Sequence, residues 1–126
     1  MRAERRRRSI SGRRGSKTLL LTTTGRKTGK QSTTPLIYES DGDRYVIVAS
    51  KGGAPEDPGW YLNLQKNPEV ELQVKDEVFK ARASTAEGAE RERLFNQMVA
   101  KMPGFGDYQR NTTRQIPVIV LARIQG

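Results

Sequence analysis

The 126-residue sequence contains no cysteine and no histidine. Without cysteine, the chain cannot form disulfides, ligate an iron–sulfur cluster or use a thiol nucleophile. Without histidine, it lacks the commonest general base and the commonest zinc ligand, which disfavours serine-triad hydrolysis and transition-metal sites. We therefore expect no metal site, and we expect any demanding chemistry to come from an organic cofactor.

Long apolar runs are also absent, the longest being residues 19–21 and 116–122. A membrane-spanning helix needs about 20 apolar residues. No apolar stretch follows the N-terminal arginines, as it would in a secretory signal. The sequence therefore predicts a cytoplasmic protein, and its length suits one domain with a single core.

Positive charge is concentrated at the N-terminus of a chain whose net charge is +9. Residues 1–17 hold eight basic residues and one acidic residue (+7), whereas residues 18–126 hold 15 basic and 13 acidic residues (+2). Residues 1–16 have too few apolar side chains to pack on a core, so we interpret them as a flexible basic arm before a domain at 17–126.

Three roles fit the basic arm. The arm is a solvated tail, or it binds an anionic membrane surface through residues 2–14, or it binds nucleic acid. The nearly balanced charge of the remaining chain gives no reason to expect specific nucleic-acid binding by the domain.

Runs of β-branched and alternating apolar residues predict six short strands. Two helices are also predicted: a short one, capped by Asp57 and begun by Pro58, and a main one from Glu87 to Lys101. After the main helix we expect a loop that carries Asp107 and Tyr108. Because the strands connect through local hairpins, the chain should be mainly β, a small antiparallel barrel with flanking helices. The expected strands are 18–24, 33–38, 45–49, 70–74, 79–84 and 116–121.

The turn Thr24–Lys30 is the first candidate site, because it presents two glycines and three cations between paired strands. Free backbone N–H groups next to guanidinium and ammonium groups suit a phosphate or carboxylate ligand. The turn lacks the spacing of a P-loop and does not open a helix. A hairpin tip with solubilising charges is therefore an equally simple interpretation.

The segment Ser50–Pro55 is the second candidate, directly after the third strand. Consecutive glycines let a backbone approach a planar ligand, Ser50 can donate to a ring carbonyl, and Lys51 can balance an anion. The alternative interpretation is that this segment is an ordinary flexible connection between a strand and a helix. The single tryptophan, Trp60, lies in the first turn of the short helix, where it is either a core residue or a ligand platform.

Four stretches of the chain together resemble the deazaflavin-dependent nitroreductase family, the F420-dependent quinone and nitro reductases of actinobacteria. They are "LLLTTTGRKTGK", "TTPLIY", "VIVASKGGAPEDPGWYLNLQKNPEVELQV" and "DYQRNTTRQIPVIVL", and the resemblance covers about residues 18–123. It implies a split β-barrel of the FMN-binding-like type. It also implies an enzyme in which reduced coenzyme F420 passes a hydride from ring carbon C5 to a quinone or similar conjugated acceptor, nitroaromatics included.

The resemblance also implies where the anionic end of the cofactor binds. Coenzyme F420 ends in a phosphate and an oligoglutamate tail, and the family's basic contacts to them match Arg26, Lys27 and Lys51, with Thr28 in the same turn. The family commonly has proline and arginine where this chain has Gln31 and Ser32, so one anion contact is missing.

The ring of the cofactor is implied to lie near the second candidate segment. Pro35 matches a residue beside the ring, and the backbone of Ser50, Lys51, Gly52 and Gly53 matches the edge around it. Trp60 matches a wall of the pocket.

The substrate side departs from the family's pattern. Three tyrosines of the family's namesake correspond here to Met102, Phe105 and Tyr108, which line the implied substrate pocket with Trp60, so one hydroxyl remains. Tyr108 and Ser50 are then the candidates to donate hydrogen bonds as charge develops in the reaction. We expect an apolar quinone such as menaquinone to be reduced better than a nitroimidazole.

Two other functions remain open from the sequence. One is a flavin mononucleotide or haem-breakdown-binding protein on the same scaffold. The other is a non-catalytic cofactor-binding or nucleic-acid-binding module in which the arm is the active part. For the reductase, the arm would hold the protein on the cytoplasmic face of an anionic membrane, where quinones reside, and barrels of this kind are often homodimers.

Overall fold

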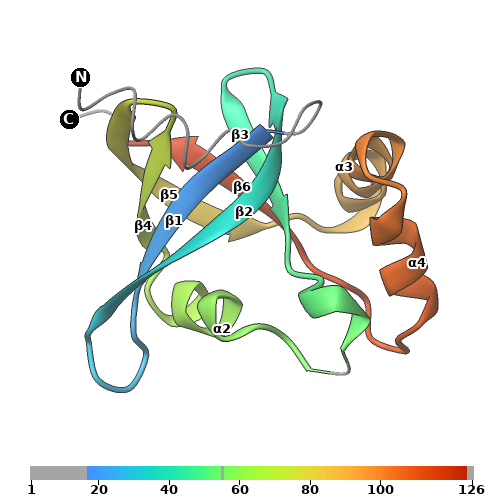
Figure 1. Ribbon diagram of the computed structural model, residues 1–126, viewed down its shortest axis with the longest axis horizontal. Coiled ribbons are helices and arrows are strands. Elements are labelled where there is room, and N and C mark those ends of the chain that lie inside the picture. The colour runs from blue at the N-terminus through green and yellow to red at the C-terminus, as the bar shows by residue number, and fades with distance from the viewer. Residues whose placement is uncertain (1–16, 55, 125–126) are drawn as a thin grey trace.

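The computed structural model describes residues 17–54 and 56–124, so the basic arm expected at residues 1–16 lies outside the described residues. Six antiparallel strands close into a split β-barrel in the order β1-β2-β3-β6-β5-β4 (Figure 1). This confirms the predicted mainly β barrel. The strands are β1 Lys17–Thr24, β2 Gln31–Asp41, β3 Arg44–Val48, β4 Glu69–Val74, β5 Glu77–Thr85 and β6 Val118–Arg123.

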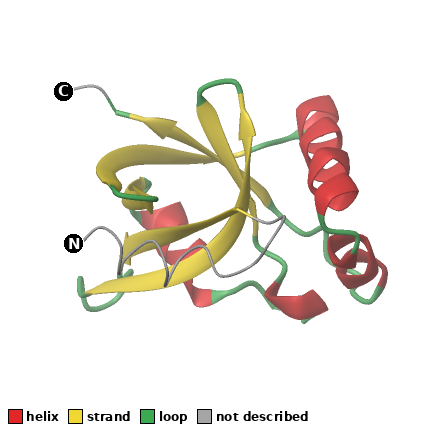
Figure 2. Ribbon diagram, turned by 45° about the horizontal axis from the view of Figure 1, so that its top comes forward, coloured by secondary structure: helices red, strands yellow, loops and turns green. Residues whose placement is uncertain are grey.

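Helices pack outside the barrel in two places (Figure 2). Two of them, α3 and α4, lie together on one side, whereas α2 and the short 3-10 helix η1 lie towards one end of the strands (Figure 1). None of the helices in the described part of the chain is long and apolar enough to cross a membrane. Their bounds are η1 Lys51–Gly53, α2 Gly59–Lys66, α3 Gly88–Lys101 and α4 Gly104–Arg110.

The segment after α3 differs from its prediction, because Asp107 and Tyr108 lie in helix α4 and not in a loop. Two glycines in this segment lower its intrinsic helix propensity. Phe105 is nevertheless buried in the same core cluster as α3, so tertiary packing holds the helix. The last strand begins two residues later than predicted, at Val118. The N–H of Ile116 bonds instead to Gln109 Oε1 at 2.9 Å.

The core has two parts, separated by the wall of the barrel. Ile47 and Ile119 belong to the cluster inside the barrel, whereas Val48 and Val118 belong to a second cluster beneath α3 and α4. Strands β3 and β6 are thus buried on both faces, which explains why their sequences are apolar without alternation.

Helix α2 closes one end of the barrel. Tyr61 and Leu64 are buried in the interior cluster, and each such apolar side chain contributes about 1.5–3 kcal/mol when fully buried. The hydroxyls of Tyr61 and Thr85 are 3.1 Å apart, within hydrogen-bond distance. This packing fixes α2 so that its first turn, with Trp60, lies at a cleft described below.

Candidate active site

A cleft of about 390 Å³ lies where β2, the β3–α2 connection and α4 meet. It combines mostly apolar walls with a few polar groups, which is typical of sites for small organic ligands. Six of its lining residues are ones singled out from the sequence: Pro35, Ser50, Lys51, Trp60, Phe105 and Tyr108. The others are Leu36, Ile37, Val48 and Pro58.

The short helix η1 contributes Lys51 to the lining of the cleft and touches α4 directly. Gly53 has φ +85°, and a Cβ built on it would lie 3.0 Å from the carbonyl oxygen of Tyr108 and 3.2 Å from its Cα. Only glycine meets both conditions without strain. Gly53 therefore approaches the protein's own helix α4 closely and is not among the residues that line the cleft, and Gly52 lies in the same turn. The approach of this backbone to a planar ligand stays a prediction.

Arg114, which was not among the predicted site residues, holds the connection between β3 and α2. Its Nε donates to Ala54 O at 2.9 Å, and its Nη2 donates to Ser50 O at 2.9 Å. Its Nη1 donates to Asp57 Oδ1 at 2.8 Å and to Ala49 O at 3.3 Å. A lone arginine in a polar stretch gives no sign of partners 57 to 65 positions away, so only the motif "DYQRNTTRQIPVIVL" could have drawn attention to it.

Asp57 therefore has a different role from the predicted helix cap. Helix α2 begins at Gly59, Pro58 occupies the cap position, and no side chain caps the helix. The carboxylate of Asp57 instead forms a half-buried ion pair with Arg114. The Asp57 carboxylate thus accepts from Arg114 and not from the N–H groups at the start of α2, and the pair links the connection to the residues before β6.

Gln109 of α4 holds the backbone of Arg114 and of Ile116 through hydrogen bonds. Its Oε1 accepts hydrogen bonds from Arg91 Nη2 at 3.0 Å and from Ile116 N at 2.9 Å, and its Nε2 donates to Arg114 O at 2.8 Å. Arg91 is buried, and its Nη2 also donates to Ile116 O at 2.6 Å. These contacts hold α4, and with it Tyr108, against the connection that leads to β6.

The basic turn is joined to the cleft through Arg26. Arg26 Nη1 donates to Asn63 Oδ1 at 2.8 Å and to Gly59 O at 3.4 Å, and its backbone N–H donates to the same Asn63 oxygen at 3.2 Å. Asn63 is buried and donates to Thr23 Oγ1 at 3.2 Å. Since Gly59 precedes Trp60 in the chain, the turn lies beside one end of the cleft.

The other cations of the turn are exposed. Neither Lys27 nor Lys30 has an acidic partner among the residues that the structure describes. The backbone N–H groups expected to be free are largely bonded within the turn: Gly25 N donates to Lys30 O at 2.7 Å, Gly29 N to Gly25 O at 3.0 Å, and Lys30 N to Thr28 Oγ1 at 3.2 Å. Side-chain cations, more than backbone groups, are thus the turn's means of binding an anion.

Lys51 already has a partner in the structure. Its Nζ lies 3.0 Å from Glu56 Oε2, and this hydrogen bond holds the pKa of the Glu56 carboxyl below its usual value. Both side chains are on the surface, where solvent and salt screen such pairs and leave them weak. An anionic ligand at Lys51 would therefore compete with a weakly held carboxylate.

The three substrate-side residues do not all reach the cleft. The rings of Phe105 and Tyr108 meet edge to face, with centroids 6.1 Å apart, and both line it. Met102 lies at the end of α3, partly buried against the core cluster beneath the helices, and is not one of the cleft's lining residues. Its carbonyl oxygen accepts the N–H of Phe105 at 3.0 Å.

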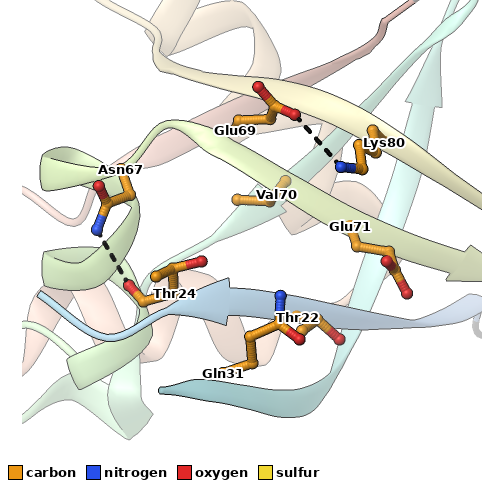
Figure 3. Close-up of a pocket in the computed structure, with 8 residues that line it drawn as sticks. All are labelled: Thr22, Thr24, Gln31, Asn67, Glu69, Val70, Glu71 and Lys80. Atoms are coloured by element: carbon orange, nitrogen blue, oxygen red, sulfur yellow. Dashed lines mark hydrogen bonds and ion pairs between the residues drawn. The ribbon is translucent and has the colours of Figure 1, made fainter. Parts of the chain in front are cut away.

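A second hollow, of about 280 Å³, lies over strands β1, β4 and β5 (Figure 3). Its polar groups are partly paired with each other: Asn67 Nδ2 donates to Thr24 O at 3.4 Å, and Lys80 Nζ lies 3.7 Å from Glu69 Oε2. None of the residues predicted to bind cofactor or substrate lines it. Its lining residues are Thr22, Thr24, Gln31, Asn67, Glu69, Val70, Glu71 and Lys80.

The chain matches the F420H(2)-dependent quinone reductase family over residues 2–123. It is 44% identical over 110 residues to an F420H(2)-dependent quinone reductase of Mycobacterium tuberculosis, covering 83% of this chain and 72% of that protein. A solved F420-H2 dependent reductase has a TM-score of 0.77 and 41% identity, covering 82% of this chain and 92% of the other. A solved chain described as a domain-swapped dimer has the same identity and TM-score and covers 82% and 78%.

The residues present fit the F420 cofactor. A mostly apolar cleft with a serine at its edge suits a planar ring, and the cations of the turn beside Gly59 suit a polyanionic tail. The match over nearly the whole chain, the 44% identity and this fit agree. The chain belongs to the F420H(2)-dependent quinone reductase family, and it is an F420-dependent reductase.

Proposed function

We propose that the cleft between β2, η1 and α4 holds both coenzyme F420 and the quinone that this enzyme reduces. The observation that carries the proposal is convergence: Pro35, Ser50, Trp60 and Tyr108 come from four separate segments and line one cleft. When bound, the reduced deazaflavin supplies the hydride. The protein's own part is to bind, to orient and to exclude water.

The side chains of the cleft divide these tasks between them. Ser50 and Tyr108 carry hydroxyls that donate hydrogen bonds to oxygens where negative charge develops. Ile37, Val48 and Phe105 supply apolar surface that keeps water out of the reacting region.

The anionic tail is proposed to lie along the basic turn. Arg26, Lys27 and Thr28 face it, and Lys51 joins them by exchanging Glu56 for the ligand. Arg26 is already oriented by Asn63, so less side-chain entropy is lost when it binds an anion. Lys27 is exposed and supplies long-range attraction that salt weakens.

Menaquinone is the proposed acceptor, and nitroimidazoles are proposed to be poor substrates. Phe105 presents a ring without a hydroxyl, and Met102, partly buried against the core cluster beneath the helices, is not among the cleft's lining residues. The cleft therefore offers an extended apolar acceptor good contact, but offers only Tyr108 as a phenolic donor for a nitro group.

The basic arm is proposed to act outside the reaction. Residues 1–16 would precede a single domain at 17–126, and residues 2–14 would bring the protein to an anionic membrane on the cytoplasmic face, where menaquinone resides. We also propose a homodimer, because a solved relative is described as a domain-swapped dimer. Sedimentation with anionic vesicles, with and without residues 1–16, and light scattering test these two statements.

The experiment for the site is a fluorescence titration with coenzyme F420, with flavin mononucleotide in parallel. Reduced complex is then mixed with menadione or with a nitroimidazole. We expect F420 to bind far more tightly than the flavin, because a flavin mononucleotide lacks the acidic tail. We expect menadione to be reduced at least about 10-fold faster, the effect of one missing hydrogen-bonding group. Equal turnover of both acceptors would contradict the proposed acceptor preference, and flavin binding alone would contradict the proposed cofactor site.

A further inference from the structure

Arg114 is hydrogen-bonded to the two segments that carry the hydroxyl groups of the cleft, although its side chain does not line the cleft. Ser50 lies in the β3–α2 connection and Tyr108 lies in α4, two segments that are far apart in the sequence. Both hydroxyls can face the same ligand only if contacts within the protein fix the position of the β3–α2 connection relative to α4.

The side chain of Arg114 holds the first segment. Three backbone carbonyls, those of Ala49, Ser50 and Ala54, accept hydrogen bonds from its guanidinium at 2.9 to 3.3 Å, and Asp57 balances its charge at 2.8 Å. A planar guanidinium with five donors can serve these acceptors together, whereas an ammonium group cannot match the same fork. The side chain is also mostly shielded from solvent, with 16% of its surface exposed.

The backbone of Arg114 is held by the second segment. Gln109, the residue after Tyr108, donates to the carbonyl oxygen of Arg114 at 2.8 Å. Gly53 packs against the backbone of Tyr108, so the two segments also touch directly. Arg114 is thus bonded on one side to the connection that carries Ser50 and on the other to the helix that carries Tyr108.

We propose that Arg114, paired with Asp57, is a positioning residue that sets the geometry between Ser50 and Tyr108 in the active cleft. This inference rests on the proposed function of the cleft. It assigns Arg114 to the orientation of the reacting groups, whereas Arg26 and Lys27 are assigned to affinity for the cofactor's tail. Removal of Arg114 should therefore lower turnover at saturation more than it weakens cofactor binding.

The first test measures backbone amide exchange without any cofactor. In Arg114→Gln, amides of the connection, including Gly53 and Ala54, which donate to Ser50 O and Lys51 O, should exchange about 10-fold faster or more, because local opening costs less. Amides of β1 and β6 should exchange as in the wild type. If exchange became faster over the whole chain, or if it did not become faster in the connection, the positioning role would be overturned.

The second test separates turnover from binding. In Arg114→Gln we expect kcat for menadione to fall about 10- to 100-fold, the cost of misplaced reacting groups, while the dissociation constant of F420 rises less than about 3-fold. Arg114→Lys, which keeps the charge beside Asp57 but not the fork, should recover only part of the loss. An equal change in kcat and in F420 affinity would contradict the proposal.

Two further variants show whether the effects of Arg114→Gln come from its own hydrogen bonds or from general destabilisation of the fold. Arg110→Gln removes a nearby surface arginine, which pairs with Asp107 on α4, and should leave exchange and kcat unchanged. Asp57→Asn keeps an acceptor oxygen for Arg114 and should lie between the wild type and Arg114→Gln in both readouts. A wild type that binds no F420 would refute the proposed function but not the exchange result, so the two failures are distinguishable.

Discussion

The basic turn at residues 25–30 and the connection at residues 49–57 both border the proposed cofactor site, but they are built differently. In the turn, Lys27 and Lys30 are exposed, and only Arg26 is oriented by a neighbouring helix. In the connection, the carbonyls of Ala49, Ser50 and Ala54 all accept hydrogen bonds from one half-buried arginine.

This difference suits two different tasks. A flexible anionic tail needs charge at short range more than it needs exact geometry, so exposed side chains on a hairpin tip are sufficient. Groups that touch the reacting ring and its acceptor must be held closely in place, because small displacements are costly for catalysis. We therefore expect substitutions in the turn to change affinity, and substitutions in the connection to change turnover.

Gly53→Ala in the connection should have the largest effect. The new methyl group would meet the backbone of Tyr108 at 3.0 Å in a conformation with φ +85°, so we expect a loss of about 2–4 kcal/mol in the free energy of unfolding from strain and overpacking. The surviving folded protein should also turn over more slowly. Chemical denaturation and steady-state kinetics measure both.

Gly29→Ala in the turn is the matched control for that substitution. Gly29 has φ +76°, but nothing lies within 4 Å of a Cβ built there. Only the backbone strain of about 1 kcal/mol remains, and kcat should not change. Equal destabilisation by the two substitutions would show that the contact with Tyr108 is not tight.

The double substitution Arg26→Ala/Lys27→Ala should have an intermediate effect, confined to binding. Loss of two cations should raise the dissociation constant of F420 about 10-fold or more at low salt, and the difference should shrink at high salt because the charges are screened. Saturating turnover and the folded state should be nearly unchanged. Lys75→Ala, at the distant β4–β5 turn, controls for the loss of a surface cation outside the basic turn. An unchanged affinity would mean that the tail binds elsewhere.

Asp41→Asn, outside both segments, should leave F420 binding at neutral pH unchanged and affect only stability. Hydrogen bonds from Arg93, and next from Arg44, lower the pKa of Asp41 from 3.8 to about 2. The ionised carboxylate therefore stabilises the fold above about pH 4 and loses this contribution as the pH falls towards 2.

The measurement for Asp41 is thermal unfolding between pH 7 and pH 2. The difference in Tm between the wild type and Asp41→Asn should be constant down to about pH 4 and then shrink. Asp43→Asn, an exposed site at the same β2–β3 turn, is the control. A difference that persists at pH 2 would mean that Asp41 does not act through its charge.

Several features were predictable because their signals are local. Alternating side chains in β4 and β5, and the unbroken apolar runs of β3 and β6, indicate which faces are buried. Helix α3 was likewise predicted almost to the residue, from the helical period of its apolar positions. The proposed site residues came from the resemblance in motif order and spacing and stay predictions, although six of the twelve line one cleft.

Other features were not predictable because distant contacts override local preference. Two glycines argued against a helix at Gly104–Arg110, but burial of Phe105 beneath the helices stabilises one. Asp57 before Pro58 is a typical helix start, yet its carboxylate pairs with an arginine 57 positions later. Met102 matches a substrate-side position, but it is partly buried against the cluster beneath the helices and is not among the cleft's lining residues.

The sequence by itself determined the class of fold, because hydrophobic periodicity and turn positions are properties of the chain, and its resemblance to a known family indicated the cofactor. Only the tertiary structure decided which side chains meet. It bonded Arg114 to Ser50 on one side and to Gln109 of α4 on the other, and it packed Gly53 against Tyr108 of α4. Such contacts depend on how the closed barrel and the helices pack in three dimensions, which no local stretch of sequence records.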